Sequence, residues 1–213
     1  MFLKVIKFFK CLPDLRILYS FKYSGILSDY GWWESYKRGL PIDKQGNPIP
    51  WVTYPFIEFI EGRLNNNLEV FEYGSGNSTF WYAKRVKYVT SLEHDRDWYE
   101  KIKSHLPENV SLFYKELVYG GDYSRFILFL NKKFNIVSID GRDRVNCIIH
   151  SINAITEDGI IILDDSERKK YEEGITFLIK NGFRKIDFWG FSPGYFNRKC
   201  TSIFYKNNNC LKI

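Results

Sequence analysis

An acidic residue, Glu72, stands near the end of a mostly apolar run at positions 68–73, and two glycines and several short polar residues follow this run directly. Gly74 and Gly76 permit a tight turn from a strand into a helix, whose first backbone N–H groups then face a ligand. A dinucleotide-binding fingerprint needs a third glycine where this chain has Thr79. Glu72 would repel phosphate oxygens but suits an ammonium group, so the pattern favours a cationic ligand; the alternative is a glycine turn with a surface glutamate. The predicted ligand-binding residues here are Glu72, Gly74, Ser75, Gly76, Asn77 and Ser78.

A second acidic residue follows the next apolar run of the chain. Glu93 lies 19 residues after Gly74, and an acidic side chain about 20 residues beyond such a turn accepts hydrogen bonds from ribose hydroxyls. His94 stands beside it and is predicted to flank a purine ring, with an exposed loop histidine as the alternative. Together with the glycine turn, Glu93 predicts a nucleoside ligand over the first two strands.

Three aspartates stand at the ends of two further apolar runs. Asp140 follows the run at 134–139, and Asp164 and Asp165 follow the run at 160–163. The carboxyl ends of neighbouring parallel strands meet at one edge of a sheet, so these side chains are expected to share a cleft. Asp140 or Asp165 is then a candidate general base that takes the proton of an acceptor hydroxyl. The alternative assigns Asp164 or Asp165 to a helix N-cap.

Apolar runs alternate with helical patterns over most of the chain, which is typical of a parallel sheet covered by helices on both faces. A helix is expected from Tyr54 to about 65–67, before the first strand. The expected strands are 68–73, 88–92, 110–114, 134–139, 160–163, 184–189 and 201–205, and the expected helices among them are 78–86, 97–106, 145–155 and 170–181. The last two strands lack a helix between them and predict an antiparallel edge hairpin. Residues 54–213 are assigned to one α/β domain, and residues 1–53 to an extension that covers the acceptor site.

Composition and charge limit the classes of partner. The 213 residues carry 31 basic and 25 acidic side chains, a formal charge of +6, but the basic residues are scattered, so no nucleic acid is expected as a partner. Aromatic residues make up 18% of the chain, which indicates either that some line a pocket or an association surface or that they pack on the surface of the domain. Lys4, Lys7 and Lys10 interrupt an apolar N-terminus, which predicts either peripheral contact with the inner face of a membrane or packing on the domain. The four cysteines lack metal-ligand spacing and indicate reduced thiols in the cytoplasm.

The ordered spacing of these motifs resembles class I S-adenosylmethionine-dependent methyltransferases over residues 54–205. The similarity lies in Glu72-x-Gly74-x-Gly76, in Glu93 at the end of the second strand and in Ile139-Asp140-Gly141 at the end of the fourth. The resemblance implies a Rossmann-like, seven-stranded, mostly parallel sheet of order 3-2-1-4-5-7-6. It also implies S-adenosylmethionine over strands one and two, with Asp140 beside it, and an acceptor over strands four and five.

Three shorter segments, 74–79, 138–143 and 162–165, are similar to bacterial methyltransferases encoded with surface-polysaccharide genes. This similarity implies O-methylation of a saccharide or a small hydroxyl acceptor. Arg142 and Arg144 would then meet an anionic acceptor; the alternative is that they lie in solvent at the start of a helix. The candidates for an aromatic wall or lid over a sugar ring are Tyr30, Trp32, Trp33 and Trp51.

Three alternatives stay open from the sequence. Catechol-type O-methyltransferases place oxygen ligands at the ends of the same two strands. That resemblance would assign Mg²⁺ to Asp140, Asp164 and Asp165, where the metal lowers the pKa of an acceptor hydroxyl. An oxidoreductase with a nucleotide cofactor is disfavoured by Thr79 and Glu72, and a non-catalytic binding protein of the same fold is the third alternative.

Overall fold

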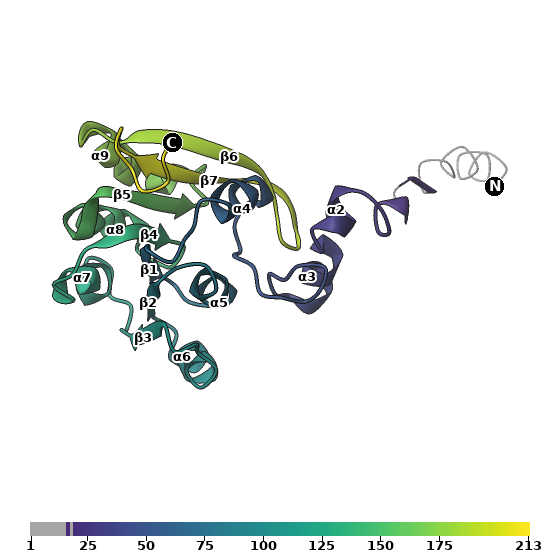
Figure 1. The fold of residues 1–213 in the computed structure, drawn as a ribbon, viewed down its shortest axis with the longest axis horizontal. Coiled ribbons are helices and arrows are strands. Elements are labelled where there is room, and N and C mark those ends of the chain that lie inside the picture. Colours follow the sequence, from purple (N-terminus) through teal and green to yellow (C-terminus); the bar gives the residue numbers. More distant parts are fainter. Residues whose placement is uncertain (1–15, 18) are drawn as a thin grey trace.

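A single seven-stranded sheet forms the centre of the computed structural model, which describes residues 16, 17 and 19–213 (Figure 1). The strands are β1 (Glu69–Tyr73), β2 (Tyr88–Glu93), β3 (Val110–Tyr114), β4 (Phe134–Ile139), β5 (Ile155–Asp164), β6 (Arg184–Ser192) and β7 (Tyr195–Tyr205). Their order in the sheet is β3-β2-β1-β4-β5-β7-β6. The strands from β3 to β5 are parallel, and β7 runs antiparallel to both β5 and β6. The predicted Rossmann-like order and the antiparallel edge hairpin are confirmed.

Two layers of helices cover the sheet, one on each face (Figure 1). The helices are α2 (Ile26–Asp29), α3 (Trp32–Arg38), α4 (Tyr54–Glu61), α5 (Asn77–Ala83), α6 (Arg96–Lys103), α7 (Asp122–Phe129), α8 (Arg144–Ser151) and α9 (Glu172–Lys180). Successive strand residues point to opposite faces. Val70 and Ile136 therefore pack in one cluster with α4 and α5, whereas Phe71 and Val137 pack in the other with α7, α8 and α9. Burial on both faces explains why these strands read as continuous apolar runs.

Helices α3 and α7 lie in segments for which the sequence predicts no regular structure. Helix α7 buries Tyr123 and Ile127 against the sheet, and α3 buries Trp32. Strand β7 is also longer than expected: it begins at Tyr195 because it continues to pair with β6 beyond the sheet, up to Ser192. This longer hairpin reaches the N-terminal segment and supplies side chains to the site described below.

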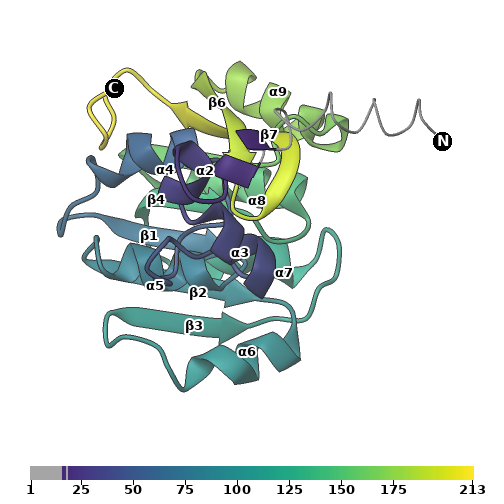
Figure 2. The ribbon, with the colours of Figure 1, turned by 90° about the vertical axis from the view of Figure 1, so that its right-hand side faces the viewer.

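The N-terminal segment 19–53 packs against the hairpin of β6 and β7, and Figure 2 shows α3 beside the connection between these strands. Trp32 is fully buried, and its Nε1 donates a hydrogen bond to the carbonyl oxygen of Tyr195 at 3.1 Å. A Cβ atom at Gly194 would lie 3.0 Å from the backbone nitrogen of Tyr36, and the φ angle there is +70°. The close approach of the two segments therefore requires glycine at the tip of the hairpin.

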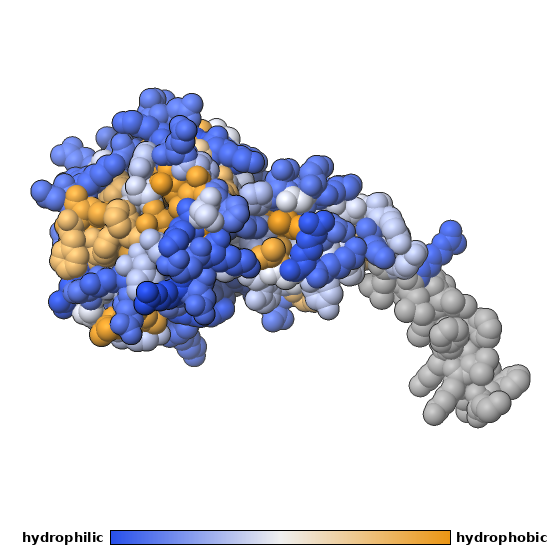
Figure 3. All heavy atoms as spheres, turned by 90° about the horizontal axis from the view of Figure 1, so that it is seen from below, coloured by the Kyte–Doolittle hydropathy of each residue, from blue (hydrophilic) through white to orange (hydrophobic). Residues whose placement is uncertain are grey.

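The face shown in Figure 3 is mostly hydrophilic, with apolar side chains gathered on the side where α7 lies. Phe113 on the edge strand β3 and Phe129 on α7 are among the exposed aromatic residues. Within the described part of the chain, no helix has both the length and the apolar character needed to cross a membrane. The predicted membrane contact through Lys4, Lys7 and Lys10 lies outside the described residues.

Candidate functional site

A cavity of about 530 Å³ lies at the carboxyl ends of β1 and β2, within the size range of small-ligand sites. We call it the turn cavity; its lining residues are Gly39, Leu40, Pro41, Trp51, Ser75, Gly76, Asn77, Ser78, Glu93, His94, Asp95, Trp98, Asp140 and Arg142. Most of the residues predicted to bind a cofactor therefore meet in one place. Residues 39–41 of the N-terminal extension close one side of it.

The turn after β1 is held close to the end of β4. The φ angle of Gly74 is +89°, and a Cβ atom there would lie 3.0 Å from the Cα of Gly141. Glycine at position 74 is thus needed for both the backbone conformation and the close approach.

The start of α5 is bound to the N-terminal extension. Nδ2 of Asn77 donates a hydrogen bond to the carbonyl oxygen of Pro41 at 2.6 Å.

Glu72 lies beneath the turn and is not among the residues that line the turn cavity. Its side chain is buried, and Oε2 accepts hydrogen bonds from the hydroxyls of Thr79 at 2.6 Å and Ser91 at 2.8 Å. Burial raises the pKa of Glu72 to about 7, although the hydroxyl donors oppose the shift. Glu72 therefore supports the turn from below, and its contact with an ammonium group stays a prediction.

Glu93 faces the turn cavity and binds both loops that flank it. Its Oε2 accepts hydrogen bonds from the backbone N–H of Ser75 at 3.0 Å and from the Ser75 hydroxyl at 2.7 Å. Its Oε1 accepts from the backbone N–H groups of His94 at 2.8 Å and Asp95 at 2.9 Å. A carboxylate has about four lone-pair positions, and these donors use them. The hydroxyl of Ser75 is the one donor that can rotate away, so it marks where a ligand hydroxyl can replace a protein group.

Two flat side chains stand beside Glu93 in the turn cavity. The indole Nε1 of Trp98 donates to the carbonyl oxygen of Ser75 at 2.9 Å, which holds the ring against the turn. The ring of His94 meets the ring of Tyr123 edge to face, with centroids 5.9 Å apart. Trp98 was not predicted as a site residue; its place in the first turn of the helix after Glu93 is the signal that could have found it.

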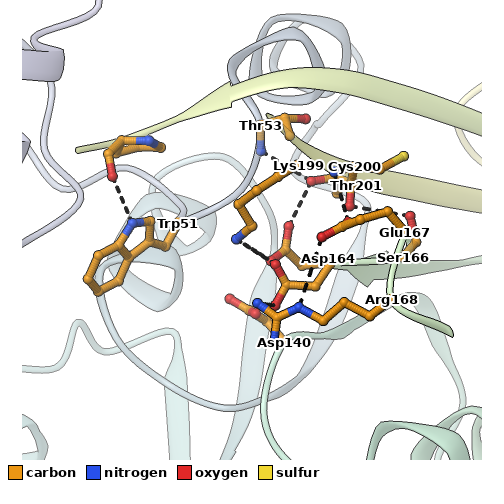
Figure 4. A network of polar contacts seen from close by, with 12 residues as sticks. Trp51, Thr53, Asp140, Asp164, Ser166, Glu167, Arg168, Lys199, Cys200 and Thr201 are labelled. Atoms are coloured by element: carbon orange, nitrogen blue, oxygen red, sulfur yellow. Dashed lines mark hydrogen bonds and ion pairs between the residues drawn. The ribbon is translucent and has the colours of Figure 1, made fainter. Parts of the chain in front are cut away.

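A second cavity, of about 510 Å³, adjoins the turn cavity above β4, β5 and β7. We call it the charged cavity; its lining residues are Trp51, Asp140, Arg142, Arg144, Asp164, Asp165, Glu167, Arg168, Tyr195, Asn197, Arg198 and Lys199. The three predicted aspartates are thus brought together. Trp51, Asp140 and Arg142 line both cavities and form a shared wall. The indole of Trp51 is fixed there by a hydrogen bond from Nε1 to the carbonyl oxygen of Pro193 at 2.8 Å (Figure 4).

The ammonium group of Lys199 lies between Asp164 and Asp165 (Figure 4). Its Nζ is 3.0 Å from Oδ2 of Asp164 and 2.8 Å from Oδ1 of Asp165. Nη2 of Arg168 lies 2.8 Å from the other oxygen of Asp165. Burial alone would raise the pKa of Asp165, but Lys199 and the neighbouring guanidinium groups outweigh it and lower this pKa. At Asp164, burial outweighs Lys199 and raises the pKa. Both carboxylates nevertheless lie against cations of the protein itself.

Arg144 connects the ends of β4 and β5. Its Nη2 donates to the carbonyl oxygen of Asp140 at 2.7 Å and to Oδ1 of the same residue at 2.9 Å, and its Nη1 donates to the carbonyl oxygen of Asp164. Its donors are thus directed at protein atoms, which leaves Arg142 as the exposed arginine of the predicted pair. Asp140 keeps 34% of its side chain exposed. The low-dielectric surroundings and the charge of Asp164 raise the pKa of Asp140 to about 7, against the effect of Arg144.

The three aspartates do not fit the predicted Mg²⁺ ion. Among residues 16, 17 and 19–213, no group of three or more His, Cys, Asp or Glu side chains is arranged to hold a metal ion. A magnesium site needs carboxylate oxygens that are free to coordinate the ion. Here Lys199 lies against Asp164 and Asp165, and Arg144 lies against Asp140.

Trp32 and Trp33, which were predicted to bind the acceptor, line neither cavity. Trp32 is fully buried under the hairpin, and Nε1 of Trp33 donates to the carbonyl oxygen of Phe21 at 3.1 Å, away from the two cavities. Of the aromatic candidates in the extension, Trp51 is the one at the site. The sequence cannot distinguish these tryptophans, because their positions depend on the hairpin that folds back onto the extension.

Lys199 and Arg198 were also absent from the predicted site. They lie on β7, more than 30 residues after the aspartates that Lys199 contacts. Only the antiparallel pairing of β5 with β7, which sets Asp164 opposite Thr201, brings them to the cavity. No local pattern in the sequence signals this contact.

Solved structures share this fold over most of the chain. Precorrin-6y C5,15-methyltransferase from Geobacter metallireducens is 14% identical, with a TM-score of 0.56, and the match covers 71% of this chain and 87% of that chain. A methyltransferase-like protein from Silicibacter pomeroyi is 20% identical, with a TM-score of 0.53 and coverage of 75% and 89%. A Streptococcus mutans protein, described as a methyltransferase and solved in complex with S-adenosylhomocysteine, is 12% identical, with a TM-score of 0.53 and coverage of 72% and 99%.

No protein-family model matches the chain, and no curated protein matches it in sequence. At these low identities the solved structures show a common fold. The evidence for function therefore comes from the residues and charges of the two cavities.

Proposed function

We propose that this chain transfers a methyl group from S-adenosylmethionine to a hydroxyl group of an acceptor, without a metal ion. The observation that carries the proposal is the pair of adjoining cavities with the shared wall of Trp51, Asp140 and Arg142. One cavity is shaped by a glycine turn and acidic side chains at the ends of β1 and β2, as a cationic nucleoside requires. The other is lined by Asp140, a carboxylate of raised pKa, and is the cavity that we assign to the acceptor.

The turn cavity fits the donor by the chemistry of its lining. The carboxylate of Glu93 accepts hydrogen bonds from the ribose hydroxyls. These hydroxyls replace the rotatable hydroxyl of Ser75, which donates to Glu93 in their absence. Trp98 and His94 supply flat surfaces for the adenine ring. When bound, S-adenosylmethionine supplies the electrophilic methyl group. Holding the acceptor in line with this group can contribute on the order of 7–11 kcal/mol to lowering the barrier.

Asp140 is the proposed proton acceptor. An alcohol is a weak nucleophile, so a side chain within reach must take its proton as the new bond forms. The pKa of Asp140 is raised to about 7, and its side chain is partly exposed at the shared wall. Asp165, the other candidate base, is bound by Lys199 and Arg168 and has a lowered pKa, so it is less suited to this role.

We further propose that the acceptor is a saccharide and that the methyl group is transferred to one of its hydroxyl oxygens. Trp51 lies at the shared wall and packs near Tyr195, with ring centroids 5.5 Å apart. Both rings line the charged cavity, and aromatic faces suit the apolar faces of sugar rings.

Calorimetric titration with S-adenosylhomocysteine tests the donor site. We expect saturable binding to the wild-type chain and a loss of roughly 1.5–3 kcal/mol of binding free energy in Glu93→Gln, since a charge-assisted contact is removed. Glu108→Gln is the matched control, because Glu108 is exposed and lines neither cavity. Binding of a nicotinamide dinucleotide in place of S-adenosylhomocysteine would refute the proposal.

Removal of metal ions tests the proposal that methyl transfer needs no metal ion. Because Lys199 and Arg144 already bind the three aspartates, methyl transfer should continue at the same rate in the presence of a chelator. Activity that disappears with the chelator and returns with Mg²⁺ would show that the ion pairs open to admit a metal.

A further inference from the structure

The two cavities carry opposite balances of charge. The charged cavity is lined by the cationic side chains of Arg142, Arg144, Arg168, Arg198 and Lys199 and by the carboxylates of Asp140, Asp164, Asp165 and Glu167. The lining of the turn cavity contains three acidic residues, Glu93, Asp95 and Asp140. Among the described residues that line this cavity, Arg142 is the one with a lysine or arginine side chain. The potential therefore becomes more positive from the donor side to the acceptor side of the shared wall.

The carboxylates of the charged cavity are already bound by groups of the protein. Asp164 and Asp165 share the ammonium group of Lys199, and Asp140 binds Arg144 at 2.9 Å. One carboxylate oxygen of Glu167 lies 3.9 Å from Nε of Arg168, and the other accepts the backbone N–H of Cys200 at 3.0 Å. An anion that enters this cavity therefore meets carboxylates whose charge is largely compensated.

Two arginines of the cavity keep their charge uncompensated. Arg142 and Arg198 are both exposed, and neither forms an ion pair within the described part of the chain. The guanidinium group of Arg198 lies 4.1 Å from the ring centroid of Trp189. Stacking on an aromatic face orients the guanidinium plane and leaves the N–H groups at its edge able to donate.

We propose that the acceptor carries an oxyanion, a carboxylate or a phosphate, which Arg142 and Arg198 bind in the charged cavity. This inference rests on the proposed methyl transfer and specifies its acceptor. Guanidinium groups bind such oxyanions through paired, charge-assisted hydrogen bonds. With the anion held there, the hydroxyl to be methylated faces Asp140 at the shared wall. A neutral analogue leaves both arginines without a partner, so the pair selects for charge.

The test is an NMR titration of the full chain in the presence of saturating S-adenosylhomocysteine. Inorganic phosphate and acetate should shift the side-chain signals of Arg142 and Arg198 in a saturable way, whereas neutral acetamide should not. The double variant Arg142→Gln/Arg198→Gln should bind the anion roughly tenfold more weakly or worse. Arg184→Gln is the matched control, since Arg184 is exposed on the same hairpin but lines neither cavity. The anion that binds with the higher affinity, phosphate or acetate, indicates whether the acceptor carries a phosphate or a carboxylate.

Binding of S-adenosylhomocysteine, measured first in the same samples, separates the two proposals. If it binds but the anions cause no saturable shift, or acetamide causes the same shift, the anionic acceptor is refuted and the methyltransferase proposal stands. If it does not bind, the proposed function fails, and the anion titration of the chain alone still decides whether the arginine pair is an oxyanion site. A cooperative thermal unfolding transition like that of the wild-type chain, followed by circular dichroism, shows that the double variant folds, since Arg142 also lines the turn cavity.

Discussion

On the two sides of the shared wall, buried carboxylates are held by different kinds of partner. In and beneath the turn cavity, Glu93 and Glu72 accept hydrogen bonds from hydroxyls and backbone N–H groups. Nδ1 of His94 also lies 2.9 Å from Oε1 of Glu93, but no lysine or arginine of the described residues pairs with either glutamate. In the charged cavity, Asp164 and Asp165 pair with Lys199. Neutral donors leave the ionised carboxylate of Glu93 a negative potential that a cationic ligand can use, whereas burial raises the pKa of Glu72 to about 7. A carboxylate paired with a lysine or arginine has lost most of this potential.

This difference shows why residue type alone misassigns the aspartates. From the sequence, Glu93 and the Asp140–Asp164–Asp165 group are equally acidic features at strand ends. In the structure the first lines the turn cavity, where we propose that it binds the ligand, and most of the second holds β4, β5 and β7 together. Asp140 is the exception, because part of its side chain remains exposed at the shared wall.

The largest expected effect is on methyl transfer through Asp140. We expect Asp140→Asn to lower kcat by roughly 10²–10⁴-fold, since it removes the proton acceptor, while affinity for S-adenosylhomocysteine changes far less. The pKa of Asp140 is about 7, and a base acts when deprotonated, so kcat/KM should rise with pH through about 7 and then level. A rate that is independent of pH from 5 to 9, or unchanged in the variant, would contradict this role.

Lys199→Met tests the claim that the other aspartates are structural. Removing the ammonium group leaves Asp164 and Asp165 without their main partner, and breaking a buried ion pair costs about 3–5 kcal/mol. The free energy of unfolding, measured in denaturant, should fall by this amount, and Lys199→Arg should recover part of it. Lys180→Met on α9 is the control, since Lys180 is exposed. A stable Lys199→Met variant would mean that the ion pairs contribute little.

Glu72→Gln probes the buried carboxylate on the donor side. The pKa of Glu72 lies at about 7 in the folded chain, above its ordinary value of 4.5, so ionisation between these pH values favours the unfolded chain. Glu72 therefore lowers stability as pH rises through this window, by up to about 3 kcal/mol. Glutamine keeps an acceptor for the hydroxyls of Thr79 and Ser91 without the charge.

The free energy of unfolding of Glu72→Gln, relative to wild type, should thus increase from pH 4.5 to 7 and stay constant above. The same comparison with Glu108→Gln should show no such trend. A difference that does not change with pH would indicate that the Glu72 carboxylate is not perturbed by burial.

The sequence predicts the sheet well because its central strands are buried on both faces. Runs such as 134–139 and 160–163 are apolar throughout, so strand positions and the parallel order follow from composition and alternation. Helix α7 was missed, although Tyr123, Phe126, Ile127 and Leu130 have helical spacing, because no strong cap precedes it; Gly121 stands at its N-cap without a side-chain hydrogen bond.

The site is predictable where one local segment builds it and unpredictable where distant segments meet. Ser75 to Ser78 and Glu93 each follow a strand, so their convergence at the turn cavity follows from the fold. Lys199 and Arg198 reach the aspartates only through the β5–β7 pairing, and Trp51 and Trp32 differ only in how the hairpin packs on them. These contacts depend on tertiary structure that no local spacing encodes.

An experimental structure of the chain with bound S-adenosylhomocysteine tests the central claim most directly. We expect adenosine between residues 75–78 and Trp98, ribose hydroxyls on Glu93, and the sulfur atom directed at the wall of Trp51 and Asp140. A ligand seated in the charged cavity, or against a face of the molecule away from Glu93, would contradict the proposed donor site.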